Sequence, residues 1–332
     1  MADAMDRYLI IRLSSLGDII HTLPALAALR RHQPESRIAW IVGKNGRAIL
    51  DLTRGIDEVI VLGSPGWRSR VRSRDQVALD FQGLLKSAFV SRLSGSRRRI
   101  GFDRANLKEP LAGLFYTERL GPVPEEDHVI RKNMALLRAI GIEDDRIEFP
   151  LVIPDPLIEK ARVLTGGLGL PPGRPFILIN TGAAWASKRW RPEKWIGVAK
   201  RLKTRGLPML LLWGNSDERA IADAVGRTTG VPLVPFLSLP EVMALIRAAS
   251  LLISGDTFAL QAACALSVPV VGIFGPTNPA RNGPFRAEDR VAFREMDCSL
   301  CYKRDCRELR CLENLASEEV ASLALERLGL HA

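Results

Sequence analysis

The chain has 332 residues, a formal net charge of +10 and a pI near 9.7, and 47% of its residues are hydrophobic. This length exceeds that of one typical domain and suits two, and the composition is that of a globular protein. No basic region precedes an apolar core at the start, and the most apolar stretch, residues 251–274, is interrupted by polar residues. These features exclude a signal peptide and a membrane span, so we expect a cytoplasmic protein with an anionic partner.

The opening of the chain predicts a strand, a tight turn and a helix. Residues 8–13 are apolar except Arg12, a polar turn follows at residues 14–18, and Leu23, Leu26 and Ala27 then recur at helical spacing. This order is typical of the first unit of a doubly wound α/β domain, in which ligands bind at the carboxyl ends of the strands. Asp18 lies at that edge, either as a catalytic carboxylate or only as a cap of the helix.

The rest of the first half continues the α/β pattern. Strands are expected at residues 37–42, 59–62, 77–81 and 100–102. A basic loop follows the third strand, and its arginines are either solvated or bind an anion near Asp18; they are Arg68, Arg70, Arg72 and Arg74. Prolines between residues 150 and 175 and glycines at 166–169 predict a linker, with the domain boundary near residue 170.

The second half repeats the pattern with residues suited to phosphate. A strand at residues 176–180 precedes a loop that carries Thr181 and Lys188. A strand at 251–254 precedes Asp256 and a helix start, whose free backbone amides form an anion site. Glu218, at another helix start, either interacts with the helix dipole or accepts hydrogen bonds from ribose. A cleft between the two halves is expected.

Five segments in the right order resemble the bacterial lipopolysaccharide heptosyltransferases, family 9 of the glycosyltransferases. They are residues 13–24 (Leu-Ser-Ser-Leu-Gly-Asp-Ile-Ile-His-Thr-Leu-Pro), 80–83 (Asp-Phe-Gln-Gly), 188–190 (Lys-Arg-Trp), 255–257 (Gly-Asp-Thr) and 274–277 (Phe-Gly-Pro-Thr). Residues 102–116 are most similar to the heptosyltransferase I group. The resemblance implies a GT-B fold, with Rossmann-like domains at 1–170 for the acceptor and 171–332 for the nucleotide sugar. It also implies that the last helix, about 317–329, packs back on the first domain.

The resemblance further implies an inverting, metal-independent transfer of heptose from ADP-heptose to the Kdo/lipid A inner core of lipopolysaccharide. Asp18 matches the catalytic base and Lys188 the lysine that binds the diphosphate. The implied donor-binding residues are Thr181, Lys188, Glu218, Asp256, Thr257, Phe258 and Gln261. The implied acceptor-binding residues are Ser14, Ser15, Gly17, Arg68, Arg70, Arg72, Gln82 and Lys108. No cofactor is required, and the basic surface would favour the anionic cytoplasmic face of the inner membrane.

Two residues depart from the family pattern. The family commonly has Asp-Thr-Gly-x-x-His where this chain has Phe258 in place of the glycine and Gln261 in place of the histidine. A family member that moves a different sugar is therefore an alternative, and a catalytically silent sugar-nucleotide or lipid-surface binding protein is another. Asp18 and Lys188 favour an enzyme. No nucleic-acid-binding module is recognisable.

Four cysteines cluster near the end of the chain. They are Cys298, Cys301, Cys306 and Cys311, with two, four and four residues between successive cysteines. Four thiolates could form a tetrahedral structural zinc site, although the last two spacings are wide. Reduced thiols, or occasional disulfides, are the default expectation in a cytoplasmic protein.

Overall fold

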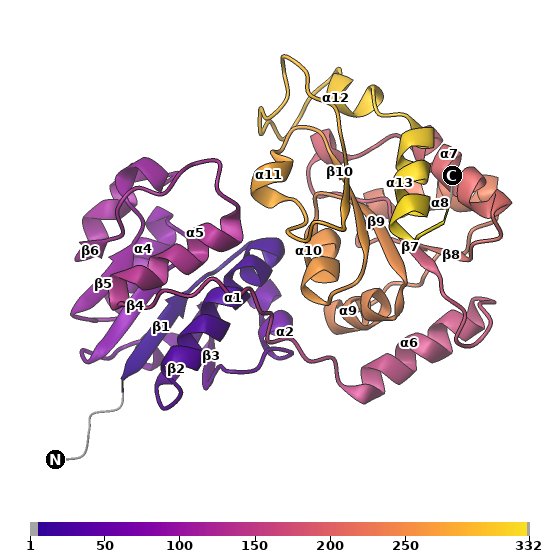
Figure 1. Ribbon diagram of the computed structural model, residues 1–332. Coiled ribbons are helices and arrows are strands. Elements are labelled where there is room, and N and C mark those ends of the chain that lie inside the picture. Colours follow the sequence, from indigo (N-terminus) through magenta and orange to yellow (C-terminus); the bar gives the residue numbers. More distant parts are fainter. Residues whose placement is uncertain (1–5, 331–332) are drawn as a thin grey trace. The chain divides into compact units, whose positions relative to one another are not determined.

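The chain folds into two α/β units, and the computed structural model describes residues 6–330 (Figure 1). The boundary lies between Val152 and Ile153, earlier than the boundary predicted near residue 170. The predicted linker is instead largely helical, because α6 (Asp155–Gly167) contains two of its glycines. α6 packs on α9 (Leu239–Ala248), so it belongs to the second unit.

The first unit contains a six-stranded parallel sheet in the order β3-β2-β1-β4-β5-β6. This is the doubly wound order, in which the winding direction changes between β1 and β4. The strands are β1 (Arg7–Ile11), β2 (Arg37–Val42), β3 (Glu58–Val61), β4 (Gln76–Asp80), β5 (Arg98–Gly101) and β6 (Glu118–Arg119). The helices are α1 (Leu16–His32), α2 (Arg47–Leu50), α3 (Trp67–Arg70), α4 (Leu85–Leu93) and α5 (Val129–Leu136), with 3₁₀ turns η1 (Lys44–Gly46), η2 (Arg104–Asn106), η3 (Pro110–Phe115) and η4 (Leu137–Ile140).

Alternation along β1 separates the two faces of this sheet. Leu9 and Ile11 point to one face, where they pack with Val71 and with Val90 of α4. α1 and α5 pack against each other on the other face (Figure 1). Every residue of α1 from 19 to 29 is buried, so this helix is enclosed on all sides rather than along the one stripe that the sequence predicts.

The second unit contains a five-stranded parallel sheet in the order β11-β10-β9-β7-β8, whose winding direction changes between β7 and β9. The strands are β7 (Ile177–Asn180), β8 (Met209–Leu212), β9 (Leu251–Gly255), β10 (Val270–Phe274) and β11 (Arg290–Phe293). Besides α6 and α9, the helices are α7 (Pro192–Thr204), α8 (Ser216–Thr229), α10 (Phe258–Ala265), α11 (Pro279–Asn282), α12 (Arg310–Glu313) and α13 (Ser317–Arg327), with the 3₁₀ turn η5 (Ala186–Lys188).

The last helix packs on its own unit. Val320, Ala324 and Leu325 of α13 enter the same apolar core as Trp195 and Val198 of α7. α13 also contacts β10 and β11. The apolar side of α13 is therefore filled by the sheet and α7 of its own unit, and packing of this helix on the first unit stays a prediction. Within residues 6–330, no helix has both the length and the apolar composition needed to cross a membrane.

Candidate functional site

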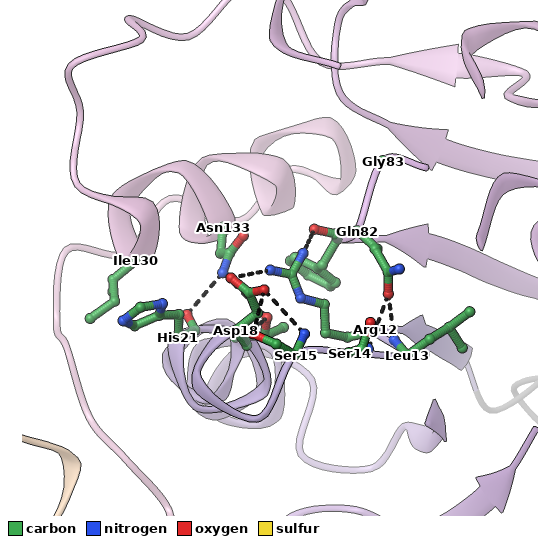
Figure 2. A network of polar contacts seen from close by, with 12 residues as sticks. Arg12, Leu13, Ser14, Ser15, Asp18, His21, Gln82, Gly83, Ile130 and Asn133 are labelled. Carbon is green, nitrogen blue, oxygen red and sulfur yellow. Dashed lines mark hydrogen bonds and ion pairs between the residues drawn. The ribbon is translucent and has the colours of Figure 1, made fainter. Parts of the chain in front are cut away.

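The first unit gathers polar groups where the winding direction of its sheet changes, at the carboxyl ends of β1 and β4 (Figure 2). The side chain of Gln82, just beyond β4, accepts hydrogen bonds from the backbone amides of Leu13 (2.7 Å) and Ser14 (3.2 Å). Asp80 Oδ1 in turn accepts bonds from the amides of Gln82 (2.9 Å) and Gly83 (3.2 Å). Gln82 therefore links the end of β4 to the end of β1, about 70 residues earlier in the sequence, and Asp80 holds the turn that carries Gln82.

Asp18 lies at the start of α1 but does not occupy the capping position itself. Ser15 is the N-cap residue, and Asp18 is the third helical residue of a capping box. Asp18 Oδ2 accepts hydrogen bonds from the Ser15 amide (3.1 Å) and the Ser15 hydroxyl (2.9 Å). Its other oxygen, Oδ1, pairs with Arg12 at 2.9 Å. Asp18 therefore takes part in capping and is also held in one orientation by a cation, a combination that the sequence alone does not reveal.

The Asp18 carboxylate is charged and open to solvent on one side. Desolvation would raise its pKa, but the charge of Arg12, the proximity of His21 and the hydrogen bonds from Ser15 together lower the pKa below its ordinary value. The Asp18 side chain is 41% exposed, whereas that of Arg12 is only 7% exposed. Arg12 also donates a hydrogen bond to the Phe81 carbonyl, which anchors it to the end of β4. The carboxylate can thus receive a proton from a molecule in solution.

A second layer of polar contacts fixes the beginning of α1 against α5. Thr22 Oγ1 donates to the Asp18 carbonyl at 2.9 Å, and Asn133 of α5 donates to the His21 carbonyl at 2.9 Å and to Thr22 Oγ1 at 3.2 Å (Figure 2). The rings of His21 and His128 meet edge to face with centroids 5.9 Å apart. Sequence reasoning missed Arg12, His21 and Asn133. The only available signal was a charged residue inside the apolar run of β1.

Asp80 differs from Asp18 in being fully enclosed. Its exposed fraction is 0%, and burial raises its pKa although hydrogen bonds from Tyr116, Gln82, Ser87 and Gly83 act in the opposite direction. The Tyr116 hydroxyl donates to Asp80 Oδ2 at 2.8 Å. Asp80 is therefore a support beneath the Gln82 turn rather than a group that meets a ligand.

The structure brings together only part of the acceptor set. Ser14, Ser15 and Gly17 line the turn after β1, and Gln82 bonds to that turn directly. Lys108 is exposed. It lies beside the β4–α4 turn, because both of its neighbours contact that turn: Leu107 packs where a side chain at Gly83 would stand, and Glu109 accepts from the Leu85 amide at 2.6 Å.

The predicted arginine loop lies elsewhere, and this is a correction. Arg70 pairs with Glu58, the first residue of β3, at 2.9 Å and also donates to the Val59 carbonyl. The amide of Ser73, next to Arg72, bonds to Ser94 at the end of α4. α3 carries the chain back to the amino ends of the strands, because a parallel β4 must start there. Arg70 and Arg72 therefore lie away from the edge that holds Asp18, and Arg68 is exposed with its guanidinium over the Trp67 ring.

The second unit also has a polar cluster where its winding direction changes, between β7 and β9. Lys188 Nζ pairs with Asp256 Oδ2 at 2.6 Å, and Thr277 Oγ1 donates to the same oxygen at 2.8 Å. The Lys188 ammonium also lies 4.3 Å from the centre of the Trp185 ring. Both members of this pair are largely buried, with 14% of the Lys188 side chain and 9% of the Asp256 side chain exposed.

Hydroxyl groups and helix amides surround this pair. Asn180 at the end of β7 donates to Ser254 Oγ (3.0 Å) and Thr257 Oγ1 (3.1 Å), which fixes the N-cap residue of α10. The free amides of α10 begin immediately after Thr257. Among the described residues, the buried Thr181 hydroxyl has no hydrogen-bond partner. Thr181 directly follows Asn180, whose side chain contacts the N-cap residue of α10, and a buried hydroxyl without a partner near a helix start suits an anionic ligand such as a diphosphate.

Glu218 and the two residues that depart from the family pattern have different surroundings. Glu218 accepts from the Gly214 amide at 2.8 Å, and its carboxylate fills the space that a side chain at Gly182 would occupy, so Glu218 reaches the loop after β7. Gln261 is buried and donates to the Asn282 carbonyl of α11 at 2.8 Å, whereas Phe258 is half-buried at the start of α10. Gln261 thus acts as a link to α11.

The four clustered cysteines are separate thiols. Cys301 and Cys306 are exposed, Cys298 is half-buried and Cys311 is buried, which raises the pKa of the Cys311 thiol. Within the described part of the chain, no three His, Cys, Asp or Glu side chains are grouped as metal ligands would be. The fifth cysteine, Cys264, is buried in α10.

Comparison with known proteins yields one family and several close folds. The model of glycosyltransferase family 9 (heptosyltransferase) matches residues 68–312. Lipopolysaccharide heptosyltransferase 1 of Pseudomonas aeruginosa is 29% identical over 320 residues, which cover 90% of this chain and 87% of that protein. E. coli heptosyltransferase WaaC with ADP-2-deoxy-2-fluoro heptose has a TM-score of 0.75 at 22% identity, covering 96% of this chain and 99% of that one. The family 9 glycosyl transferase from Veillonella parvula has a TM-score of 0.82 at 21% identity, with 97% of each chain covered.

Proposed function

The chain belongs to glycosyltransferase family 9, and we propose that it transfers L-glycero-D-manno-heptose from ADP-heptose to the Kdo/lipid A inner core of lipopolysaccharide. It is a glycosyltransferase, and both of its units have the parallel α/β architecture of the solved family members. Two relatives support the substrates. One is named as a lipopolysaccharide heptosyltransferase, and the structure of another contains an ADP-heptose analogue. The observation that carries the proposal is the solvent-accessible Asp18 carboxylate held by Arg12.

In this proposal Asp18 is the general base of an inverting transfer. The acceptor hydroxyl oxygen attacks the anomeric carbon of heptose while the bond from that carbon to the ADP oxygen breaks. The hydroxyl proton passes to Asp18, and configuration inverts because there is a single displacement. The lowered pKa of Asp18 keeps it deprotonated at neutral pH, and Arg12 and Ser15 fix the direction of the carboxylate.

The second unit would bind the nucleotide sugar. Lys188, the Thr181 hydroxyl and the amides at the start of α10 would bind the diphosphate, and Glu218 would accept hydrogen bonds from the ribose. As the ADP oxygen departs it gains negative charge, which an ammonium group and oriented amides can stabilise. We therefore propose that the reaction proceeds without a metal, with Asp256 and Thr277 holding Lys188 in position.

The test is a transfer assay on the purified full chain. ADP release is measured with ADP-heptose and Kdo-lipid A in the presence of excess chelator, and the anomeric configuration of the product is determined by NMR. We expect turnover that requires the Kdo-bearing acceptor, and a product with the α configuration from the β-linked donor. A product that retains the β configuration would contradict the single displacement, and no turnover on any Kdo-bearing acceptor would overturn the proposed acceptor.

A different donor sugar is the alternative, and the surroundings of Phe258 and Gln261 favour testing it. Because Gln261 donates to Asn282, its amide is committed to the protein where the family commonly has a histidine. ADP-glucose and ADP-mannose assayed beside ADP-heptose distinguish the two donors. A specificity ratio above about tenfold for ADP-heptose supports the leading proposal, because pocket differences of 1–3 kcal/mol give ratios of this size.

A further inference from the structure

Four large apolar side chains of the first unit lie on the surface of two neighbouring elements. Leu85 and Phe89 of α4 are 40% and 51% exposed, and Leu111 and Leu114 of η3 are 63% and 65% exposed. The residues of each pair, four apart on the α-helix and three apart on the 3₁₀ turn, share one face. α4 and η3 pack together, with the Phe89 and Phe115 rings edge to face at 6.3 Å. These four residues form one surface, which we call the α4–η3 patch.

α4 is only weakly amphipathic. Its buried side combines Val90 with the small residues Ser87, Ala88 and Ser91, while its larger apolar side chains Leu85 and Phe89 are exposed to solvent. The buried serines are satisfied within their own helix, because their hydroxyls donate to the carbonyls of Leu84 (2.9 Å) and Ala88 (2.6 Å). A surface helix normally buries its large apolar side chains, so an arrangement that exposes them indicates a binding surface.

The surroundings of the patch are strongly basic. Residues 85–119 contain eight Lys or Arg and three Asp or Glu. The three acids are engaged: Asp103 accepts from the Ala105 amide, Glu109 accepts from the Leu85 amide, and Glu118 pairs with Arg98. By contrast, six exposed cations of this segment form no ion pair among the described residues; they are Lys86, Arg92, Arg97, Arg104, Lys108 and Arg119.

From this combination we propose that the α4–η3 patch docks on an anionic lipid surface. Apolar side chains that enter the boundary between headgroups and acyl chains, surrounded by Lys and Arg at the headgroups, are the features that bind peripheral proteins to anionic membranes. A second copy of the chain fits less well, because a two-fold contact would place the same basic surface against itself. The charge therefore selects the lipid as the occupant.

The position of the patch gives docking a consequence for catalysis, and this part rests on the proposed function. α4 begins directly after Gln82 and Gly83, and Gln82 bonds to Leu13 and Ser14 in the turn that leads to Asp18. A membrane held at α4 and η3 therefore borders the edge of the sheet that holds the base. An acceptor anchored in that membrane by its lipid would reach Asp18 without leaving the bilayer.

The test is co-sedimentation of the full chain with vesicles. Phosphatidylethanolamine vesicles with 30% phosphatidylglycerol are compared with phosphatidylcholine vesicles. We expect binding to the anionic vesicles that weakens with salt, and little binding to the zwitterionic ones. Phe89→Gln with Leu114→Gln should reduce the partition coefficient at least tenfold, and Lys86→Gln with Arg92→Gln should reduce it by roughly fivefold per cation. Equal binding to both vesicle types, or unchanged binding of the Phe89/Leu114 variant, would overturn the proposal.

Matched controls come from the second unit. Ile158→Gln with Val163→Gln removes two exposed apolar residues of α6, and Lys200→Gln with Arg227→Gln removes two exposed cations. Both controls should bind vesicles like the parent. ADP release on a water-soluble Kdo acceptor separates docking from chemistry: the patch variants should keep the parent rate there and lose rate only on vesicle-bound acceptor. A parent that dimerises through the patch, shown by sedimentation velocity of parent and Phe89/Leu114 variant, would contradict lipid as the occupant.

Discussion

The two units each have an ion pair where the winding of the sheet changes, but only the first unit exposes one member of the pair to solvent. In the first unit the cation Arg12 is buried and the carboxylate Asp18 is 41% exposed, at a separation of 2.9 Å. In the second unit the carboxylate Asp256 is 9% exposed and Lys188 is 14% exposed, at 2.6 Å. The same topology thus presents a fixed negative charge in one unit and a nearly enclosed pair, beside a helix start, in the other. This difference suits a proton acceptor in the first unit and an anion site in the second.

Asp18→Asn should have the largest effect, because it removes the exposed charge of the first unit and keeps the shape. The amide oxygen can still accept from Ser15, so the fold should persist. We expect kcat to fall by about 10² to 10⁴, the usual contribution of a general base. The measurement is ADP release at saturating substrates, with thermal unfolding as a check on folding.

Asp51→Asn is the matched control for this substitution. Asp51 pairs with Arg47 on the surface four residues away, and an exposed pair of this kind contributes little. It should leave kcat unchanged. If the kcat of Asp18→Asn stayed within threefold of the parent value, the exposed carboxylate of the first unit would not be the proton acceptor.

Lys188→Met tests the enclosed pair of the second unit. We expect kcat to fall by about 10² or more, because a charge that stabilises the leaving diphosphate is lost. The buried Asp256 carboxylate also loses its partner, which should lower the free energy of unfolding by about 3 kcal/mol.

Adding Asp256→Asn to Lys188→Met separates these two roles of the lysine. The double variant should recover most of the stability, because no uncompensated charge stays buried, but it should not recover the activity. Urea unfolding and ADP release on the same samples measure both. Recovery of activity together with stability would show that Lys188 has only a structural role.

Arg12→Met should move the pH dependence of the first site. In the parent, Arg12 helps to hold the pKa of Asp18 below its ordinary value of about 3.9, so the base stays deprotonated and the acid limb of kcat/KM lies low. Without Arg12, desolvation dominates and the limb should rise by about 1 to 3 pH units. A pH profile of kcat/KM is the measurement, and an unchanged acid limb would exclude Arg12 as the group that sets the Asp18 charge.

Asp80→Asn should have the smallest effect, on stability alone. The pKa of Asp80 is raised in the folded state by burial, so its stabilising contribution is complete below the unfolded pKa near 3.9 and is lost as pH rises through the folded pKa. The neutral amide does not titrate, so the variant should lose less stability than the parent between pH 4 and pH 8. Each pH unit between the folded and unfolded pKa corresponds to about 1.4 kcal/mol.

Urea unfolding at several pH values measures this difference directly. The same pH series on Asp18→Asn should show a difference from the parent of the opposite sign. The folded-state pKa of Asp18 is lowered, so its charge stabilises the fold above the unfolded pKa, and this stabilisation is lost as pH falls. Two carboxylates of one unit with opposite pH dependence would sharpen the contrast between an exposed, paired acid and an enclosed one. Parallel pH dependence of the two variants would contradict it.

The sequence by itself determined the elements and the edge on which the site lies. Apolar runs of strand length predicted β1, β2, β4, β7 and β9 close to their observed bounds. In a parallel sheet every strand ends at the same edge, so a residue in the turn or helix start after a strand, such as Asp18 or Asp256, is placed by local pattern alone. The family resemblance and its glycosyltransferase activity were also present in the motifs, and the family match confirms them.

Only the tertiary structure decided which of these residues meet. Gln82 reaches Leu13 because β4 lies beside β1 in the sheet, and the sequences of these two strands do not by themselves reveal that they are neighbours. The arginine loop was misplaced because residues late in a crossover return to the opposite edge, as Arg70 does when it pairs with Glu58. The boundary was misplaced because α6 finds its packing partner in α9, about 80 residues later. These contacts depend on long-range packing, whereas hydrophobic periodicity reports only on each residue's near neighbours in the chain.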